Sequence, residues 1–292
     1  MKLLITGSSG QVGTELKQQL LRQAELLTPT RAELDLADAS AVQAYLAQHH
    51  PAVIINAAAY TAVDLAETEQ AAALALNAQL PELLSRYCAA SGAYLMHYST
   101  DYVYPGTGTT PWQEDSVTGP LNVYGHSKLQ GDLAVQQHCP TALIFRTSWV
   151  YARQGKNFVQ TILRLAKEKT ELRIVADQIG APTPASLIAA ISHQALSRWQ
   201  AGTAIAGGVY HLAPRGSCSW YDFAKVIVSQ AIAEGQSLAL SPESIQPIPS
   251  SDYPTPARRP LNSRLHVDKL EQALGIRMPE WQEAFHNLRS EQ

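Results

Sequence analysis

The feature that most constrains the fold is the alternation of short apolar runs with amphipathic segments in the first half of the chain. The apolar runs occupy residues 2–6, 52–56, 93–99 and 142–148. Helical patterns lie between them, at about 11–23, at 67–91 and from Tyr124 onward. Continuous apolar strands joined by helical crossovers are typical of parallel sheets covered on both faces. The sequence therefore predicts an α/β fold with a doubly wound parallel sheet.

The pattern changes after Trp149. Proline and glycine cluster at 177–184 and 252–263, and helical patterns are expected at 156–168, 185–200, 219–234 and 279–290. We expect residues 1–150 to form the sheet domain and residues 151–292 to form a smaller α/β lobe at its carboxyl edge. The helix at 185–200 is the segment of the second lobe that could pack on the first domain.

Composition excludes several classes of protein. The 292 residues are 46% hydrophobic and 16% charged with a net charge of −3, which is typical of a soluble globular protein and disfavours nucleic-acid or anionic-membrane partners. Neither the cysteines nor the nine histidines show a ligand spacing, so we predict reduced thiols and no metal site. The N-terminus lacks a signal-peptide core and no stretch approaches a membrane span, so we expect a cytoplasmic protein. The three cysteines are Cys88, Cys139 and Cys218.

A glycine-rich turn directly follows the first predicted strand. Gly7, Gly10 and Gly13 are spaced G-x-x-G-x-x-G at the start of the first predicted helix. Glycines there let a pyrophosphate approach the backbone N–H groups of a helix N-terminus, where the helix dipole favours an anion. The common fingerprint is G-x-G-x-x-G, so a plain turn is the alternative. The position of the motif in the first strand–helix unit favours dinucleotide binding.

The end of the second predicted strand bears on the choice of dinucleotide. NAD-selective folds usually carry an acid about 20 residues past the glycines. Here Thr30 and Arg31 end the segment 25–31, with no acid at its tip. An arginine accommodates a 2′-phosphate, which favours NADP(H) over NADH, unless Arg31 is only a solvated loop cation. Asp35 could reach an adenine amine or cap the next helix, a role that Asp38 fills better.

Two tyrosine–lysine pairs compete for a catalytic role. Tyr124–Lys128 and Tyr221–Lys225 both have the i, i+4 spacing that places two side chains on one helix face. The first pair starts a helix in the sheet domain, and the sequence STD at 99–101 ends the preceding predicted strand, where ligands of such sheets gather. The second pair lies in an apolar helical stripe and is predicted to pack. That stripe consists of Trp220, Phe223, Val226, Ile227 and Ala231.

Thr100, Tyr124 and Lys128 together suit the reduction of a ketone. Hydride transfer leaves an alkoxide that must be protonated in place, and a tyrosine with a pKa near 10 relays protons poorly at neutral pH. A neighbouring ammonium favours the phenolate, so Lys128 is expected to lower the pKa of Tyr124. The Thr100 hydroxyl can bind the substrate oxygen and fix its geometry.

With these residues in this order, the chain resembles the dTDP-4-dehydrorhamnose reductase family of the extended short-chain dehydrogenase/reductase superfamily. The resemblance runs from residue 3 to about 270. It implies a Rossmann domain of the extended type and NADPH-dependent reduction of the C4 ketone of dTDP-4-dehydro-L-rhamnose. The product, dTDP-L-rhamnose, is an activated sugar for cell-surface polysaccharides. The motifs are GQVG, NAAAYTAVD, HYSTDYVYPG, PLNVYGHSKLQGD, FRTSWVYA, NF, DQIGAPT and RRPLNSRL.

The resemblance also implies roles for individual residues. Tyr124 becomes the proton donor, Lys128 holds the nicotinamide ribose, and Thr100 with Asp101 contacts the sugar. Trp149 lines the sugar pocket. The resemblance also implies three further groups of cofactor contacts. Gly10, Gln11 and Val12 would contact the pyrophosphate, and Asp35 and Leu36 would lie near the adenine. Ala59, Tyr60 and Thr61, after the strand at 52–56, would lie under the cofactor.

Other positions are assigned from their chemistry. Arg259 is a candidate for binding the nucleotide diphosphate, because a guanidinium suits phosphate oxygens, with a helix cap or a surface ion pair as the alternative. His126 and Ser127, between Tyr124 and Lys128, are expected to need no particular side chain. A nucleotide-sugar substrate is the expected partner, and a homodimer is left open, as is a divalent cation.

Three rival functions remain at this point. Other nucleotide-sugar 4-ketoreductases and epimerases share the fold. Dehydratases of the superfamily carry a glutamate after the Thr-Asp pair, where Tyr102 stands here. A non-catalytic NADP-binding regulatory subunit, such as that of methionine adenosyltransferase, would not need Thr100, Tyr124 and Lys128, whose presence favours an enzyme.

Overall fold

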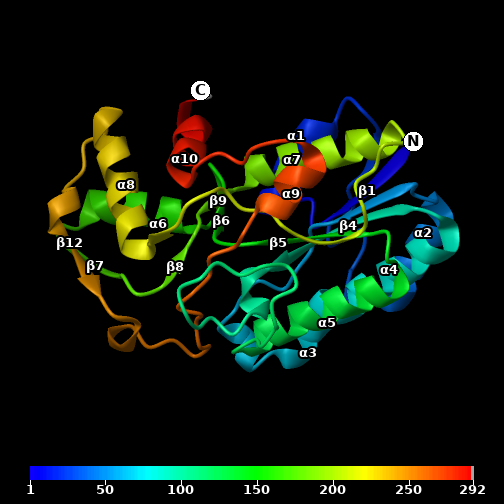
Figure 1. The fold of residues 1–292 in the computed structure, drawn as a ribbon, viewed down its shortest axis with the longest axis horizontal. Helices are drawn as coiled ribbons and strands as arrows, with labels where there is room; N and C mark the ends of the chain where they lie inside the picture. Colours follow the sequence, from blue (N-terminus) through cyan, green and yellow to red (C-terminus); the bar gives the residue numbers. More distant parts are fainter. Residues whose placement is uncertain (291–292) are drawn as a thin grey trace.

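Six parallel strands organise the larger lobe (Figure 1). The computed structural model describes residues 1–290. The strand order β10-β5-β4-β3-β1-β2 confirms the predicted doubly wound parallel sheet. Strand β1 lies between β2 and β3, and the chain runs from β1 to β2 on one side and then crosses to β3 on the other. Ligands of doubly wound sheets bind where the strand order reverses in this way, which here is the β1/β3 boundary. The strands are β1 (Lys2–Thr6), β2 (Glu25–Leu27), β3 (Val53–Asn56), β4 (Tyr94–Thr100), β5 (Leu143–Thr147) and β10 (Gly208–His211).

Helices cover both faces of this sheet because its strands are apolar on both sides. Successive side chains of a strand point to opposite faces. Ile5 accordingly packs in the cluster formed with α1 and α7, whereas Leu4 packs in the cluster formed with α2, α4 and α5. These helices are α1 (Gln11–Leu20), α2 (Ala39–His49), α4 (Leu80–Ser91), α5 (Val123–His138) and α7 (Ala185–Gln200).

The helix expected at 67–91 is interrupted. A short helix α3 (Gln70–Leu74) passes into one turn of π-helix at Ala75–Gln79 before α4 begins. Such a turn widens the backbone, is frequent at functional sites, and here precedes Pro81, which supplies no N–H. It places Asn77 in the interior, where the side chain is fully buried.

The smaller lobe has its own apolar core around Phe223 and Phe285. It lies beside the carboxyl edge of the sheet, with α8 and β12 at the far end (Figure 1). Its helices fall within two residues of the expected ranges. They are α6 (Phe158–Glu168), α8 (Trp220–Ala233) and α10 (Trp281–Ser290). The remaining elements are β6 (Val150–Tyr151), β7 (Leu172–Val175), β8 (Ile179–Gly180), β9 (Thr183–Pro184), β11 (Cys218–Ser219), β12 (Ile245–Ile248), α9 (Asp268–Leu274) and 3₁₀ turns at 65–67, 101–103, 242–244 and 250–252.

Two segments of the second half return to the large lobe. Helix α7 lies against α1, where Gln19 is within hydrogen-bonding distance of His193. Strand β10 pairs with β5 and extends the sheet. The sequence pattern did not predict β10, because the strand has only four residues and begins at the second of two consecutive glycines.

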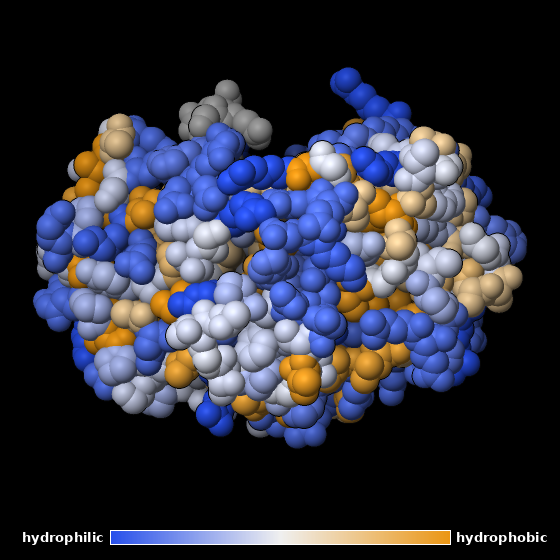
Figure 2. Space-filling view, viewed as in Figure 1, coloured by the Kyte–Doolittle hydropathy of each residue, from blue (hydrophilic) through white to orange (hydrophobic). Residues whose placement is uncertain are grey.

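The surface carries scattered rather than clustered apolar side chains on the face drawn in Figure 2, where hydrophilic residues separate small hydrophobic groups. Among exposed large hydrophobic residues, Val117 and Leu21 are far apart in the chain. Isolated residues of this kind are ordinary at a protein surface. Within residues 1–290, no helix has the length and apolar character needed to cross a membrane.

Candidate active site

The glycine turn after β1 is shaped for close approach of a ligand. Gly7 has a φ of 65°, in the left-handed region that favours glycine, and a Cβ there would lie 2.7 Å from the Ala57 backbone. A Cβ on Gly13 would lie 2.2 Å from the Gly7 carbonyl oxygen. Gly10 is the N-cap of α1, has no side chain to cap the helix, and is exposed, so N–H groups of the first turn face outward. The turn therefore fits a pyrophosphate.

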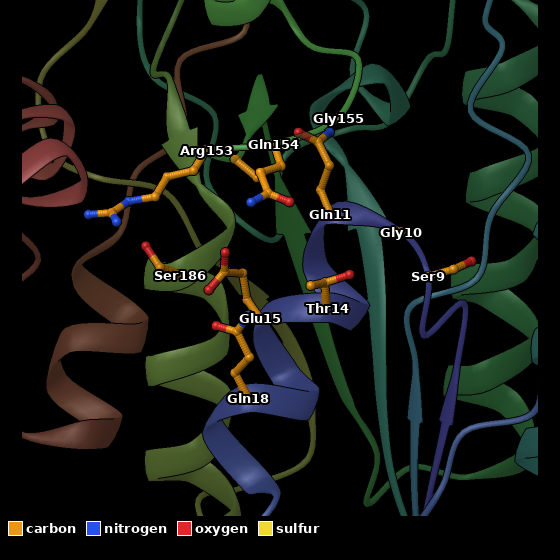
Figure 3. A pocket seen from close by; sticks show the side chains of 11 residues that line it. Ser9, Gly10, Gln11, Thr14, Glu15, Gln18, Arg153, Gln154, Gly155 and Ser186 are labelled. Atoms are coloured by element: carbon orange, nitrogen blue, oxygen red, sulfur yellow. The ribbon is translucent and has the colours of Figure 1, made fainter. Parts of the chain in front are cut away.

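A cavity of about 560 Å³ adjoins this turn. Figure 3 shows Gly10 and Gln11 at its rim, Glu15 of α1 along its wall, and the loop 153–155 of the other lobe opposite. Gln11 Oε1 accepts a hydrogen bond of 3.0 Å from Asn157, the N-cap of α6. The start of α1 is thus tied to the smaller lobe, and Val12 packs on the sheet core instead.

The region expected to bind the adenosine end contains an acid that the sequence interpretation did not weigh. Arg31 is exposed in the turn after β2. Two residues on, Glu33 accepts hydrogen bonds from the backbone N–H and hydroxyl of Thr30, at 2.7 and 2.9 Å. Asp35 is also exposed and accepts from Ala37 N at 3.1 Å.

The helix cap that competed for Asp35 belongs to Asp38. Its carboxylate accepts from Ser40 N and Ala41 N at the start of α2, as expected. Leu36 lies partly buried against the core on this side of the sheet. Asp35 therefore keeps an exposed carboxylate at the sheet edge.

The small residues after β3 form a loop held from below by Asn77. This amide accepts from Tyr60 N at 2.8 Å and donates to Tyr60 O at 3.0 Å. The Tyr60 hydroxyl donates to Glu69 at 2.6 Å. Ala59 is partly buried and Thr61 exposed, so the loop presents backbone and small side chains at the β1/β3 boundary.

The structure brings Thr100 and Tyr124 together. Thr100 is the last residue of β4 and is buried, and Tyr124 lies in the first turn of α5. Burial raises the pKa of the Tyr124 hydroxyl, the hydrogen bond with Thr100 opposes this rise, and the charges of Asp101 and Asp132 add to it. In the protein alone, the pKa of Tyr124 is therefore raised, whereas the sequence predicted that Lys128 would lower it. A raised pKa keeps the phenol protonated, as a proton donor requires.

Lys128 lies one helical turn beyond Tyr124 and is only 2% exposed. Its Nζ donates to the carbonyl oxygen of Tyr98 at 2.6 Å and lies 3.5 Å from His97 Nε2. Burial lowers the Lys128 pKa to about 8, while Asp132 acts to raise it. The ammonium is thus fixed beneath the site.

Asp101 and Tyr102 flank the hydroxyls of Thr100 and Tyr124. Burial raises the Asp101 pKa to about 7, partly offset by the nearby Ser263 hydroxyl and by the hydrogen bond from Thr100. Thr100 Oγ1 donates to Asp101 Oδ1 at 3.1 Å. The Tyr102 ring meets the Tyr124 ring edge to face, with centroids 5.6 Å apart. Tyr102 therefore supports the orientation of the Tyr124 ring.

The expectation that Ser127 needs no particular side chain is wrong. Ser127 is fully buried, donates to the Tyr124 carbonyl at 2.8 Å and accepts from Asn77 at 3.0 Å. Gly125 is equally constrained, because a Cβ there would lie 2.3 Å from the Tyr102 carbonyl oxygen. Only His126, which is exposed, lacks such a contact among the described residues.

A second cleft, of about 620 Å³, lies between the lobes. It is lined by residues 105–108 after the 3₁₀ turn and by residues 250–261. Arg259 is in its wall and pairs with Asp64 at 2.8 Å, which also accepts from Ala257 N. Its NH1 group is buried without a hydrogen-bond partner among the described residues. The surface ion pair weighed for Arg259 is therefore present, and one buried nitrogen of the guanidinium has no hydrogen bond to the described residues.

Asn122 connects this cleft to the catalytic helix. Its Oδ1 accepts from Gly125 N at 2.8 Å and caps α5. Its Nδ2 donates to the Arg258 carbonyl at 2.8 Å. One side chain thus holds both the first turn of α5 and the segment 255–263.

Trp149 occupies an unusual backbone conformation. Its φ is 47°, which costs a bulky residue on the order of 1–3 kcal/mol. The indole stacks on Trp220 with centroids 3.6 Å apart, and a Cβ on Gly180 would lie 2.7 Å from its ring. The aromatic stack and the glycine hold Trp149 at the end of β5, where the lobes meet.

The second tyrosine–lysine pair lies away from these residues. Helix α8 buries Phe223 and Ile227 in the core of the smaller lobe, as predicted, whereas Val226 is only partly buried. Lys225 Nζ lies 5.6 Å from the centroid of the Tyr221 ring. Tyr221 and Lys225 thus contact each other and none of the groups beside Tyr124.

Comparison with known proteins agrees with this geometry. The protein-family model described as RmlD substrate binding domain matches residues 1–291. The dTDP-4-dehydrorhamnose reductase of Shigella flexneri is 45% identical over 286 residues, covering 97% of this chain and 95% of its own. The Burkholderia thailandensis enzyme of that name is 45% identical over 287 residues, covering 97% and 96%.

A solved structure extends the comparison to three dimensions. The Bacillus anthracis dTDP-4-dehydrorhamnose reductase in complex with NADP superposes with a TM-score of 0.89 at 32% identity, covering 100% of this chain and 99% of that one. Sequence and fold thus agree over nearly the whole chain. The chain belongs to the dTDP-4-dehydrorhamnose reductase (RmlD) family of the extended short-chain dehydrogenase/reductases.

Proposed function

We propose that this protein catalyses the NADPH-dependent reduction of the C4 ketone of dTDP-4-dehydro-L-rhamnose to dTDP-L-rhamnose. The observation that carries the proposal is the convergence of Thr100, Tyr124 and Lys128 in a chain that matches these reductases over its full length. NADH is the alternative cofactor. Residues 1–150 hold the cofactor in this proposal, and residues 151–292 supply most of the substrate lobe.

The residues at the sheet edge fit the proposed cofactor. A side chain at Gly7 or Gly13 would fill the space beside the turn, and the first N–H groups of α1 suit a pyrophosphate. Gln11 and Val12 follow that turn and would also contact the pyrophosphate. Arg31, Asp35 and Leu36 would contact the adenosine end of the cofactor. Residues 59–61 would lie under the cofactor at the β1/β3 boundary. Bound NADPH supplies the hydride that reduces the ketone.

The chain's own residues then control the proton. Thr100 orients the ketone oxygen through its hydroxyl. Tyr124, protonated because burial raises its pKa, donates its proton to the oxygen as negative charge develops there. Lys128 would hold the nicotinamide ribose, and Asp101, hydrogen-bonded to Thr100, would contact the sugar.

The substrate fits the cleft between the lobes. Arg259 is held by Asp64 in the wall of this cleft, and its partly exposed guanidinium suits a diphosphate oxygen. Trp149, fixed by its stack on Trp220, lines the sugar end. Tyr102 stands where dehydratases carry a glutamate, so the carboxylate that removes water is missing at this position, which favours reduction over dehydration.

The direct test supplies NADPH and dTDP-4-dehydrorhamnose to the purified protein and follows the absorbance of the reduced cofactor. Oxidation of NADPH that depends on the sugar nucleotide supports the reductase. Without such oxidation the proposal fails. Tightly retained NAD with interconversion of sugar epimers would identify an epimerase instead, and cofactor binding without turnover would identify a regulatory subunit.

Arg31→Asp tests the cofactor preference. We expect the dissociation constant for NADPH to rise at least about tenfold more than that for NADH, because a cation beside the 2′-phosphate becomes an anion. Arg22→Asp makes the same charge change at an exposed site after α1 and should not discriminate between the cofactors. Titration by cofactor fluorescence measures both. Equal losses for NADPH and NADH would refute the role of Arg31.

Arg259→Met tests the diphosphate contact. We expect the KM for the sugar nucleotide to rise about 10- to 100-fold, since a hydrogen bond to a charged group is lost, while the KM for NADPH stays near the wild-type value. Arg173→Met removes a similar arginine–aspartate pair from the exposed surface and serves as the control. Steady-state kinetics with each substrate varied gives both constants. An unchanged KM for the sugar nucleotide would remove Arg259 from the site.

The setting of the reaction is also part of the proposal. We expect a cytoplasmic enzyme that acts on a soluble nucleotide sugar. A homodimer remains compatible with this function, and sedimentation of the purified protein measures it.

A further inference from the structure

Behind the catalytic pair lies a buried group of charged and polar residues. Asp132 follows Lys128 by four residues, so Tyr124, Lys128 and Asp132 share one face of α5. Asp132 is fully buried and Arg146, on β5, is 3% exposed. Charged side chains are almost never buried this deeply unless they are paired.

Arg146 fixes one carboxylate oxygen of Asp132. Its Nε donates to Asp132 Oδ2 at 3.0 Å. Its NH1 donates to the Tyr104 hydroxyl at 2.8 Å, and that hydroxyl lies 2.6 Å from His211 Nε2. Burial lowers the pKa of His211 to about 3, so this imidazole is neutral. Arg146 is therefore held on two sides and fixes the orientation of the Asp132 carboxylate.

The other oxygen of Asp132 faces His97, the residue that lies beside Lys128. Asp132 Oδ1 is buried and has no hydrogen-bond partner among the described residues. It lies 3.9 Å from His97 Nε2, which in turn lies 3.5 Å from Lys128 Nζ. His97 Nδ1 faces the Asn56 amide nitrogen at 3.0 Å, so Nδ1 accepts and the proton of the neutral ring belongs on Nε2.

The balance of charge in this group is unusual. Burial together with Lys128 lowers the pKa of His97, which leaves Asp132 as the only anion between two buried cations. His97 and the Tyr98 carbonyl, both on β4, lie next to Lys128. Tyr124 and Asp132 flank Lys128 on its own helix, α5. The other titratable or charged groups nearby are Arg146 on β5 and Asp101 just after β4. Asp132 is the group whose charge favours the ammonium form of Lys128.

We propose that Asp132, fixed by Arg146, is a positioning residue that keeps the Lys128 ammonium charged on the Tyr98 carbonyl and thereby sets the upper pH limit of catalysis. This proposal rests on the reductase function given above. Loss of the Asp132 charge favours neutral Lys128 and also favours the Tyr124 phenolate. Both changes move the fall in activity at alkaline pH toward lower pH.

The test replaces the ion pair by a neutral pair, Asp132→Asn with Arg146→Gln, so that neither partner of the pair keeps an unpaired charge. We expect the alkaline limb of kcat against pH to move down by at least about one pH unit, as for an opposite charge a few ångströms away. NADPH binding, followed by cofactor fluorescence without the sugar, should lose affinity at correspondingly lower pH. Asp132→Glu keeps the charge and should keep the wild-type profile.

The control removes a remote ion pair in the same way. Arg215→Gln with Glu271→Gln neutralises a pair away from α5 and should leave both pH profiles unchanged. If the Asp132/Arg146 double variant does not fold, Asp132→Asn compared with Asp132→Glu makes the same comparison. Unshifted profiles in a folded charge-neutral variant overturn the proposal. An inactive wild-type protein would instead refute the reductase function, whereas the NADPH-binding profile would still report on Asp132.

Discussion

Replacing Tyr124 by phenylalanine should lower kcat for the reduction about 10²- to 10⁴-fold, the range that a positioned general acid contributes. The substitution removes one hydroxyl and keeps the ring, so the edge-to-face contact with Tyr102 is preserved. NADPH binding should change little, because Lys128 and the glycine turn are untouched. Stopped-flow or steady-state assays of NADPH oxidation measure the loss.

Tyr221→Phe is the matched control for this prediction. The Tyr221 ring lies beside Lys225 on α8 and touches no residue of the trio. We expect its kcat to stay within about twofold of the wild-type value, since surface substitutions away from special features have small effects. Full activity in Tyr124→Phe, or equal losses in both variants, would show that the proton comes from another group.

Arg146→Met should destabilise the protein by about 3–5 kcal/mol, because it leaves the buried Asp132 carboxylate without its partner. The apolar methionine side chain also cannot replace the hydrogen bond that Arg146 donates to the Tyr104 hydroxyl. Urea unfolding followed by tryptophan fluorescence measures the free energy of unfolding.

Two comparisons isolate the cause of that loss. The double variant Asp132→Asn with Arg146→Gln should recover at least half of the lost stability, because the buried Asp132 carboxylate is no longer left without its partner. Arg173→Met removes an exposed pair and should cost less than about 1 kcal/mol. If the double variant were as unstable as Arg146→Met, the loss would come from packing and not from the abandoned charge.

The sequence predicted those parts of the fold that repeat a local pattern. Strands β1, β3, β4 and β5 are continuous apolar runs, and the helices between them carry periodic apolar faces, so both were recognisable. Strand β10 escaped prediction because four residues bounded by glycine hold no periodic signal. Its position depends on pairing with β5, more than sixty residues earlier in the chain.

The candidate site divides in the same way. Thr100, Tyr124 and Lys128 could be found because strand ends and helix starts converge in a parallel sheet. Asn77 and Arg146 could not, since a buried polar residue has no periodicity and its partner is distant in sequence: Asn77 bonds Ser127, and Arg146 bonds Asp132. The role of Ser127 could not be predicted for the same reason, because its partner Asn77 lies in a π-helical turn that has no signal in the sequence.

Asn122 has a mechanical consequence for the enzyme. With its carbonyl oxygen on the first turn of α5 and its amide on the Arg258 carbonyl, it acts as a rigid coupling between two parts of the molecule. A displacement of the segment 255–263 is transmitted over a single side chain to the turn that carries Tyr124. If Arg259 binds the diphosphate of the sugar nucleotide as proposed, a shift of its segment on binding would also move the turn that carries Tyr124, so binding energy gained far from C4 would improve alignment at C4.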